Sequence, residues 1–342
     1  MSKKEYLANI ICTILPDTLV DFLSNFSGRK NDLTILAYHR VLDFDDSFPF
    51  DIELISARPD QFEEQLKYIK KYYNPLTMEQ LCELHKNKSV LPDKSIVITF
   101  DDGFIDNYNI AFPLLKKYEI PATIFVSTGY IGSESTFWFD KLACLVLNNE
   151  IIVSENNLLF EIINNNTSSS KRLILEQCLE KIKSVSDSDR LSILNDLFDS
   201  NKNILDNSEC AKYSSILSWD NVKEMNKSLM SFGSHTVSHP VLSQLSESEK
   251  YHEMTDSKRM LEDQLKIPIE TIAYPVGTES AFDKSVIESA KKSGYELGIT
   301  YVHGTNKWPL LDPFTIRRLH VEHYTSIRFF KCMLSLPNIF KY

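Results

Sequence analysis

One apolar run that ends in a pair of carboxylates constrains the fold of this chain more than any other feature. Residues 95–100 form a continuous apolar segment, and Asp101 and Asp102 follow it directly. A run without regular polar alternation is typical of a strand that is buried on both faces of a parallel sheet. The sequence therefore predicts an α/β fold with this strand inside a parallel sheet.

Strand and helix patterns alternate along most of the chain. Strands are predicted at 33–38, 95–100, 122–126, 230–233, 271–274 and 297–300, and helices at 59–71, 109–118, 220–227, 246–265 and 280–293. Thr77 with Gln80, and Ser246 with Glu249, have the capping-box spacing that begins a helix. This alternation indicates a parallel sheet or barrel, and we expect a distorted (β/α) barrel.

The alternation breaks between residues 141 and 215, where Asn and Ser become abundant and two helical patterns follow. We expect a helical insertion there, one that covers a face of the barrel rather than shapes a substrate groove. The barrel with its insertion is expected over residues 33–325. An amphipathic helical segment at 1–32 precedes it, and a C-terminal segment at 326–342 follows it.

Two polar motifs that end predicted strands favour one metal site. His235 and His239 follow the strand at 230–233, and residues four apart can present both imidazoles to one side of a turn. On its own, the Asp101-Asp102 pair could be a solvated turn, and the histidines could be an ordinary surface pair. In α/β barrels, however, ligand sites collect at the C-terminal ends of the strands. Two imidazoles and one carboxylate leave a coordination position open, as in catalytic zinc sites, and the second carboxylate is free to act as a base.

The same stretches resemble the polysaccharide deacetylases, the NodB-homology family. The segments 99–103 and 235–239 are similar to the first two motifs of that family, and the segment 35–41 is similar to its entry strand. Trp219-Asp220 and the segment 273–277 resemble the bacterial surface-polysaccharide branch. The likeness runs from about residue 33 to residue 321. It implies a (β/α) barrel that hydrolyses an amide bond with the help of a metal.

The resemblance also implies a role for particular residues. Asp102, His235 and His239 would hold a divalent ion, Zn²⁺ or a similar metal. Asp101 would take the proton of the attacking water as general base, and the backbone N–H of Val276 would stabilise the oxyanion.

Two further roles stay open at this point. The last motif of the family usually supplies a His as the general acid, and the resemblance makes His320 the nearest match to it, with His39, which follows the first predicted strand, as its rival. Many family members have an Arg where this chain has Ala273, so Arg318 could supply the missing cation or form a structural salt bridge. We expect the substrate to contact His39, Tyr274, Pro275 and Arg318.

The implied activity is removal of N-acetyl groups from amino sugars of a polysaccharide or a lipid-linked saccharide. A deformylase, another amidase or an O-deacetylase of the same superfamily would use a similar site. A non-catalytic glycan-binding protein is a further alternative, but it would have no need of both three metal ligands and a spare carboxylate.

Composition and the chain ends bear on partners and location. The formal net charge of −10 argues against general nucleic-acid binding, because phosphate contacts need clustered Lys and Arg. The six cysteines have no paired spacing, so we expect free, mostly buried thiols, as in a reducing compartment. No cleavable signal is recognised, which makes cytoplasmic residence the expectation. Apolar residues at three- and four-residue spacing near the N-terminus, and the stretch 327–331, leave peripheral contact with the inner membrane surface open.

Overall fold

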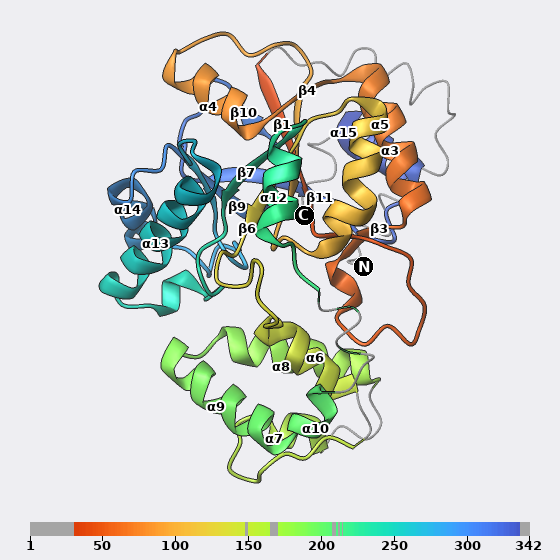
Figure 1. The fold of residues 1–342 in the computed structure, drawn as a ribbon, viewed down its shortest axis with the longest axis vertical. Helices are drawn as coiled ribbons and strands as arrows, with labels where there is room; N and C mark the ends of the chain where they lie inside the picture. Colours follow the sequence, from red (N-terminus) through yellow and green to blue (C-terminus); the bar gives the residue numbers. More distant parts are fainter. Residues whose placement is uncertain are drawn as a thin grey trace.

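Seven parallel strands close into a barrel at the centre of the molecule (Figure 1). The structure is a computed structural model that describes residues 31–147, 150–164, 170–206, 210, 213 and 215–335. Around the barrel the strands follow the order β1 (Asp32–Tyr38), β11 (Ile316–His320), β9 (Leu297–His303), β8 (Thr271–Ala273), β7 (Met230–Ser234), β6 (Ala122–Val126) and β5 (Ser95–Phe100). Pairing of Ile35 with Val97 joins β1 to β5 and closes the ring. The predicted (β/α) barrel is thus confirmed.

Four short strands complete the sheet structure among the described residues. Strand β4 (Asn74–Leu76) runs parallel to β5, and β10 (Asn306–Lys307) pairs antiparallel with β1. Strands β2 (Arg40–Val41) and β3 (Ile55–Ala57) form a separate parallel pair. Every residue of β5 is buried, as expected for a strand covered on both faces.

Helices cover the outside of the barrel (Figure 1). They are α3 (Pro59–Tyr72), α4 (Met78–Lys86), α5 (Phe112–Tyr118), α12 (Trp219–Asn226), α13 (Glu247–Leu265), α14 (Lys284–Lys292) and α15 (Ile327–Ser335). Both capping boxes form, since Thr77 accepts from the Gln80 N–H and Ser246 accepts from the Glu249 N–H. The helix predicted at 280–293 begins only at Lys284, because the Asp283 side chain caps it by accepting from the Val286 N–H.

The insertion forms a helical lobe beside the barrel, drawn in green below it in Figure 1. It consists of α6 (Trp138–Leu147), α7 (Phe160–Asn164), α8 (Lys171–Lys183), α9 (Asp187–Ser200) and α10 (Lys202–Leu205). The apolar side chains of the lobe, among them Leu142, Leu175 and Leu194, belong to one buried cluster that also contains Phe50 and Phe104 from outside the lobe. This shared cluster packs the lobe against the barrel part of the chain.

One cysteine pair contradicts the expectation of free thiols. Cys144 in α6 and Cys210 form a disulfide across 66 residues, with their Cα atoms 6.4 Å apart. No spacing pattern in the sequence indicates this bond, because only the folded lobe brings these two segments together. Cys82, Cys178 and Cys332 are free and buried, as expected. Cys12 lies outside the described residues.

The expected membrane segments are only partly covered by the structure. The amphipathic segment proposed for 1–32 falls almost wholly outside the described residues, as do residues 336–342. The apolar and basic stretch 327–331 lies in α15, where Phe329 and Phe330 are buried and Phe330 contacts Tyr68 of α3. This stretch therefore packs on its own protein. In the described part of the chain, no helix combines the length and apolar character needed to cross a bilayer.

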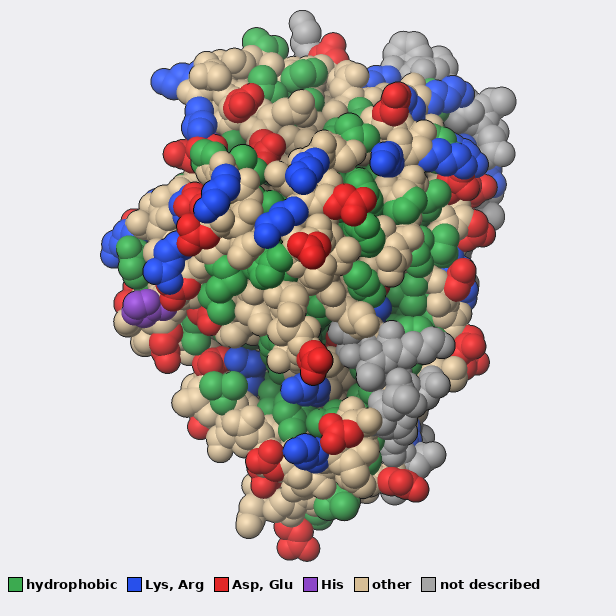
Figure 2. Space-filling model, in the orientation of Figure 1, with side chains coloured by type: hydrophobic (Ala, Val, Ile, Leu, Met, Phe, Trp, Pro, Cys, Tyr) green, Lys and Arg blue, Asp and Glu red, His purple; other side chains and the backbone are tan. Residues whose placement is uncertain are grey.

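Charged side chains of both signs lie interspersed over the barrel and the lobe on the face drawn in Figure 2. A continuous basic stripe is the surface that tracks a phosphate backbone. On this face, Lys and Arg side chains are instead interspersed with Asp and Glu side chains.

Candidate metal and catalytic site

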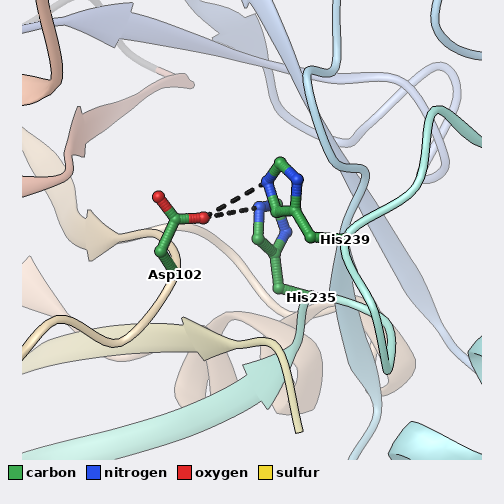
Figure 3. Close-up of side chains that lie close together, drawn as sticks. All are labelled: Asp102, His235 and His239. Atoms are coloured by element: carbon green, nitrogen blue, oxygen red, sulfur yellow. Dashed lines mark ion pairs between the residues drawn. The ribbon is translucent and has the colours of Figure 1, made fainter. Parts of the chain in front are cut away.

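Three predicted metal ligands converge at the C-terminal end of the barrel (Figure 3). Asp102 follows β5, whereas His235 and His239 follow β7. The Asp102 Oδ1 atom lies 3.5 Å from Nε2 of His235 and 3.3 Å from Nε2 of His239. All three side chains are buried. The structure thus brings together residues from two segments that are more than a hundred positions apart.

The donor set fits a divalent cation. The Asp102 Oδ1 atom is buried and has no hydrogen-bond partner among the described residues, although two ring nitrogens face it. Burial lowers the pKa of His235, and it lowers the pKa of His239 to about 3, so both rings are neutral and offer a lone pair. One carboxylate oxygen and two imidazole nitrogens with an open side are the ligands of a catalytic zinc site.

The His235 ring is held in place by a contact of its Nδ1 atom, on the side away from Asp102. Its Nδ1 lies 2.8 Å from the carbonyl oxygen of Ala273, at the end of β8. A proton on Nδ1 that is donated to this carbonyl leaves Nε2 unprotonated and directed toward Asp102. Second contacts of this kind hold the ring and tautomer of metal-binding histidines.

The backbone around the site adopts an unusual conformation. Asp102, Thr236, His239 and Val276 have φ angles of 75°, 68°, 56° and 63°. A positive φ is uncommon outside glycine and is costly for the β-branched Thr and Val. Such positions persist only where the surrounding structure imposes them, and they cluster at functional sites. Their concentration here marks this end of the barrel independently of the side-chain chemistry.

Asp101 is held by a two-pronged contact with Arg318. Nη1 of Arg318 donates to Oδ1 of Asp101 at 2.8 Å, and Nη2 donates to Oδ2 at 2.7 Å. Arg318 is fully buried, and its Nε donates to the carbonyl of Thr300. Burial alone would raise the pKa of Asp101, but the guanidinium holds it well below its usual range. This ion pair fits both roles left open for Arg318, a cation that acts on the proposed base and a structural salt bridge.

The two candidate general acids occupy different positions. Nε2 of His39 lies 4.0 Å from Oδ2 of Asp101, and His39 lines the cavity that contains the candidate metal ligands. His320 is absent from the lining of this cavity. Its ring stacks on Tyr301 with centroids 3.7 Å apart and an interplanar angle of 11°. Tyr301 itself lines the cavity, so His320 contacts a residue of the cavity wall without lining the cavity.

The cavity has a volume of about 270 Å³ and walls that the sequence did not reveal. Its lining adds, to the predicted residues, Asp51, Glu53, Leu54, Trp138, Phe139, Leu179, Lys183, Thr278, Tyr301 and Glu322. Tyr274 and Val276 line it as well, whereas Pro275 is not among the lining residues. The Tyr274 hydroxyl donates to the Phe314 carbonyl, so this side chain forms wall structure.

The helical lobe contributes directly to this cavity, contrary to the expectation that it only covers a face. Trp138 and Phe139 come from α6, and Leu179 and Lys183 come from α8. The Trp138 Nε1–H donates to the carbonyl of His239 at 3.3 Å, and the Phe139 ring lies 5.1 Å from the His239 ring. The apolar run at 137–139 signals burial in the sequence, but it does not show what it is buried against.

Comparisons with known proteins agree with this geometry. The family described as "Polysaccharide deacetylase" matches residues 88–298, more than half of the chain. A Staphylococcus aureus poly-beta-1,6-N-acetyl-D-glucosamine N-deacetylase is 35% identical over 124 residues, which cover 34% of this chain and 42% of the relative. The matched stretch therefore spans less than half the length of that relative.

Two solved structures are similar over most of the chain. The Streptococcus pyogenes deacetylase PplD, solved in complex with acetate, has a TM-score of 0.58 and 25% identity, covering 87% of this chain and 96% of that one. IcaB from Ammonifex degensii has a TM-score of 0.55 and 20% identity, covering 87% and 94%. The second likeness supports the fold alone.

Proposed function

The chain belongs to the polysaccharide deacetylase family, and on that premise we propose that it is a metal-dependent hydrolase that removes N-acetyl groups from amino sugars of a polysaccharide. One observation carries this proposal. A carboxylate that is ion-paired with a buried arginine, Asp101, lies directly beside three convergent metal ligands. A site that only binds glycan would not need a base held next to a metal site.

The residues of this chain divide the chemistry between them. Asp102, His235 and His239 would hold the cation, which when bound supplies Lewis-acid polarisation of the acetyl carbonyl and activation of water. Asp101 accepts the proton of the attacking water, and Arg318 keeps its carboxylate ionised for that purpose. Zn²⁺ is the metal that we propose, because its preferred ligands are the ones present.

Val276 is proposed to stabilise the negative charge on the carbonyl oxygen. In its loop the Tyr274 N–H donates to the Ile299 carbonyl, and the Gly277 N–H donates to the Pro275 carbonyl. No partner for the Val276 N–H is found within the described part of the chain. With its positive φ, this residue can present its N–H to the cavity that it lines.

We propose His39 as the general acid, in place of the expected His320. We expect His39→Gln to lower kcat by roughly two to four orders of magnitude, because the leaving amine loses its proton donor. His320→Gln, the matched control, should change kcat far less, since that ring packs behind Tyr301. Steady-state acetate release by the zinc-loaded variants measures both. A larger loss from His320→Gln than from His39→Gln would reverse the assignment.

The substrate proposed is an N-acetylglucosamine polymer, by analogy with the substrate in the name of the Staphylococcus aureus relative. The test is acetate release by the zinc-loaded protein from β-1,6-linked N-acetylglucosamine oligomers, with O-acetylated glycans in parallel. Release of acetate from the amide supports the proposal. Formate release from an N-formylated sugar alone, ester cleavage alone, or glycan binding without hydrolysis would each identify one of the alternative functions.

Location in the cell and a lipid-linked saccharide substrate stay proposals. Cytoplasmic residence, with contact to the inner membrane surface, requires Cys144 and Cys210 to remain reduced, because disulfides are rare in the cytosol. The disulfide between them is typical of an oxidising compartment instead. Thiol labelling of these two cysteines in fractionated cells distinguishes the two locations.

A further inference from the structure

Lys183 extends from the helical lobe into the wall of the catalytic cavity. It is the last residue of α8, and Leu179, one turn earlier on the same helix, lines the same cavity. Residues four apart share one face of a helix. This face of α8 therefore brings Leu179 and Lys183 together to the wall of the cavity that also contains Asp101 and the proposed metal ligands.

A purely structural reason for Lys183 explains only part of its placement. Cations are favourable in the last turn of a helix, where they offset the negative end of the helix dipole. Lys181 supplies such a cation from the same turn and is exposed. Lys183 is instead partly buried, and burial lowers its pKa. An interaction with the helix dipole does not require burial, so it does not explain why the Lys183 side chain is partly removed from water.

The Lys183 ammonium lacks a direct partner within the described part of the chain. No hydrogen bond or ion pair joins it to another described residue. Asp51, which lines the same cavity, and Glu180, on the same helix, act on it only through their charges. The charge of Lys183 reaches His239 as well. A partly desolvated cation of this kind gains free energy from any acceptor that enters the cavity.

The other charges of the cavity restrict what this acceptor can be. Asp51, Glu53 and Glu322 all line it. Their carboxylates repel phosphate and carboxylate groups, and they can accept hydrogen bonds from hydroxyl groups. A neutral sugar, whose hydroxyls both donate and accept, suits this mixed lining better than an acidic sugar does.

We propose that Lys183 is a specificity-determining residue of the deacetylase site, and that its ammonium donates a hydrogen bond to an uncharged hydroxyl or amide oxygen of the amino sugar in the cavity. This inference rests on the proposed function and deepens it. The insertion is then part of the substrate site, and the preferred substrate is an uncharged glycan without phosphate or uronate groups near the acetylated sugar.

The test compares Lys183→Met with Lys181→Met in the zinc-loaded full chain. Methionine keeps the apolar stem and removes the charge, and both variants lose one last-turn cation, so the pair cancels the helix-dipole effect. We expect Lys183→Met to raise KM for N-acetylglucosamine oligomers roughly ten- to hundredfold with a much smaller change in kcat. Lys181→Met should keep the wild-type KM, and Lys183→Arg should recover part of the lost affinity.

Equilibrium binding gives a second readout without turnover. Calorimetric titration of the same oligomers into Asp101→Asn, with and without Lys183→Met, should show a matching rise in Kd. An unchanged KM and Kd in Lys183→Met, a fall in kcat alone, or an equal effect from Lys181→Met would overturn the inference while leaving the deacetylase activity established. A wild-type protein that releases no acetate would instead overturn the proposed function, and this inference with it.

Discussion

Asp101→Asn is expected to lower kcat for acetate release by roughly two to four orders of magnitude, the usual contribution of a general base. The amide has nearly the shape of the carboxylate but cannot accept the proton of the attacking water. Binding of Zn²⁺ should persist, because the proposed metal ligands are Asp102, His235 and His239. Turnover measured together with metal content checks both parts. An Asp101→Asn protein that retains zinc and full activity would remove Asp101 from the mechanism.

Loss of stability must be separated from loss of the base. Asp101→Asn leaves the buried Arg318 without its counter-charge, and breaking a buried ion pair in this way costs about 3–5 kcal/mol. The double variant Asp101→Asn/Arg318→Met removes both charges and should regain much of the thermal stability. It should not regain activity. Recovery of activity along with stability would show that the single variant fails through unfolding.

Arg318→Met alone tests the tuning of the base through the pH profile. Without the guanidinium, burial is the dominant effect on Asp101 and raises its pKa. A base with a higher pKa is protonated at a higher pH, so the acid limb of the kcat/KM profile should move toward neutral pH. The direction of this move distinguishes a tuned base from a merely structural salt bridge, which would lower activity equally at all pH values.

The parts of the site that could be predicted from the sequence are local. The buried strand at 95–100 and the pair Asp101-Asp102 are adjacent in the chain, and His235 and His239 are four residues apart. Parallel strands of a barrel end on the same side, so two short motifs after two strands were enough to predict one metal site. The capping boxes were equally local, and the helices α4 and α13 begin where they indicated.

The other walls of the cavity depend on long-range packing, which sequence motifs do not reveal. Asp51, Trp138 and Lys183 come from a loop and from two helices of the lobe, and none lies in a motif with recognisable chemistry. The position of His320 illustrates the same limit. His320 lies two residues after Arg318, so strand alternation places both side chains on the same face of the strand. Only the fold shows that the Tyr301 ring is stacked against His320. The disulfide of Cys144 likewise requires the folded lobe.

Removal of one metal ligand is the second change with a very large expected effect. His239→Ala should abolish stoichiometric zinc binding and lower acetate release by roughly three orders of magnitude or more, since Lewis-acid assistance supplies several kcal/mol of transition-state stabilisation. His252→Ala is the matched control. That histidine lies exposed on α13, with its Nδ1 4.0 Å from Asp256, and should bind zinc and turn over as the wild type does.

Thermal unfolding provides a readout of the metal site that does not depend on turnover. A ligand that binds only the folded state raises its stability in proportion to the logarithm of ligand concentration over Kd. Adding Zn²⁺ to the metal-depleted wild type and to His252→Ala should therefore raise Tm, whereas His239→Ala should show little response. An equal rise in all three proteins would mean that zinc binds elsewhere. Asp102, His235 and His239 would then be a buried polar cluster that binds no metal. Metal-assisted hydrolysis at this end of the barrel would be excluded.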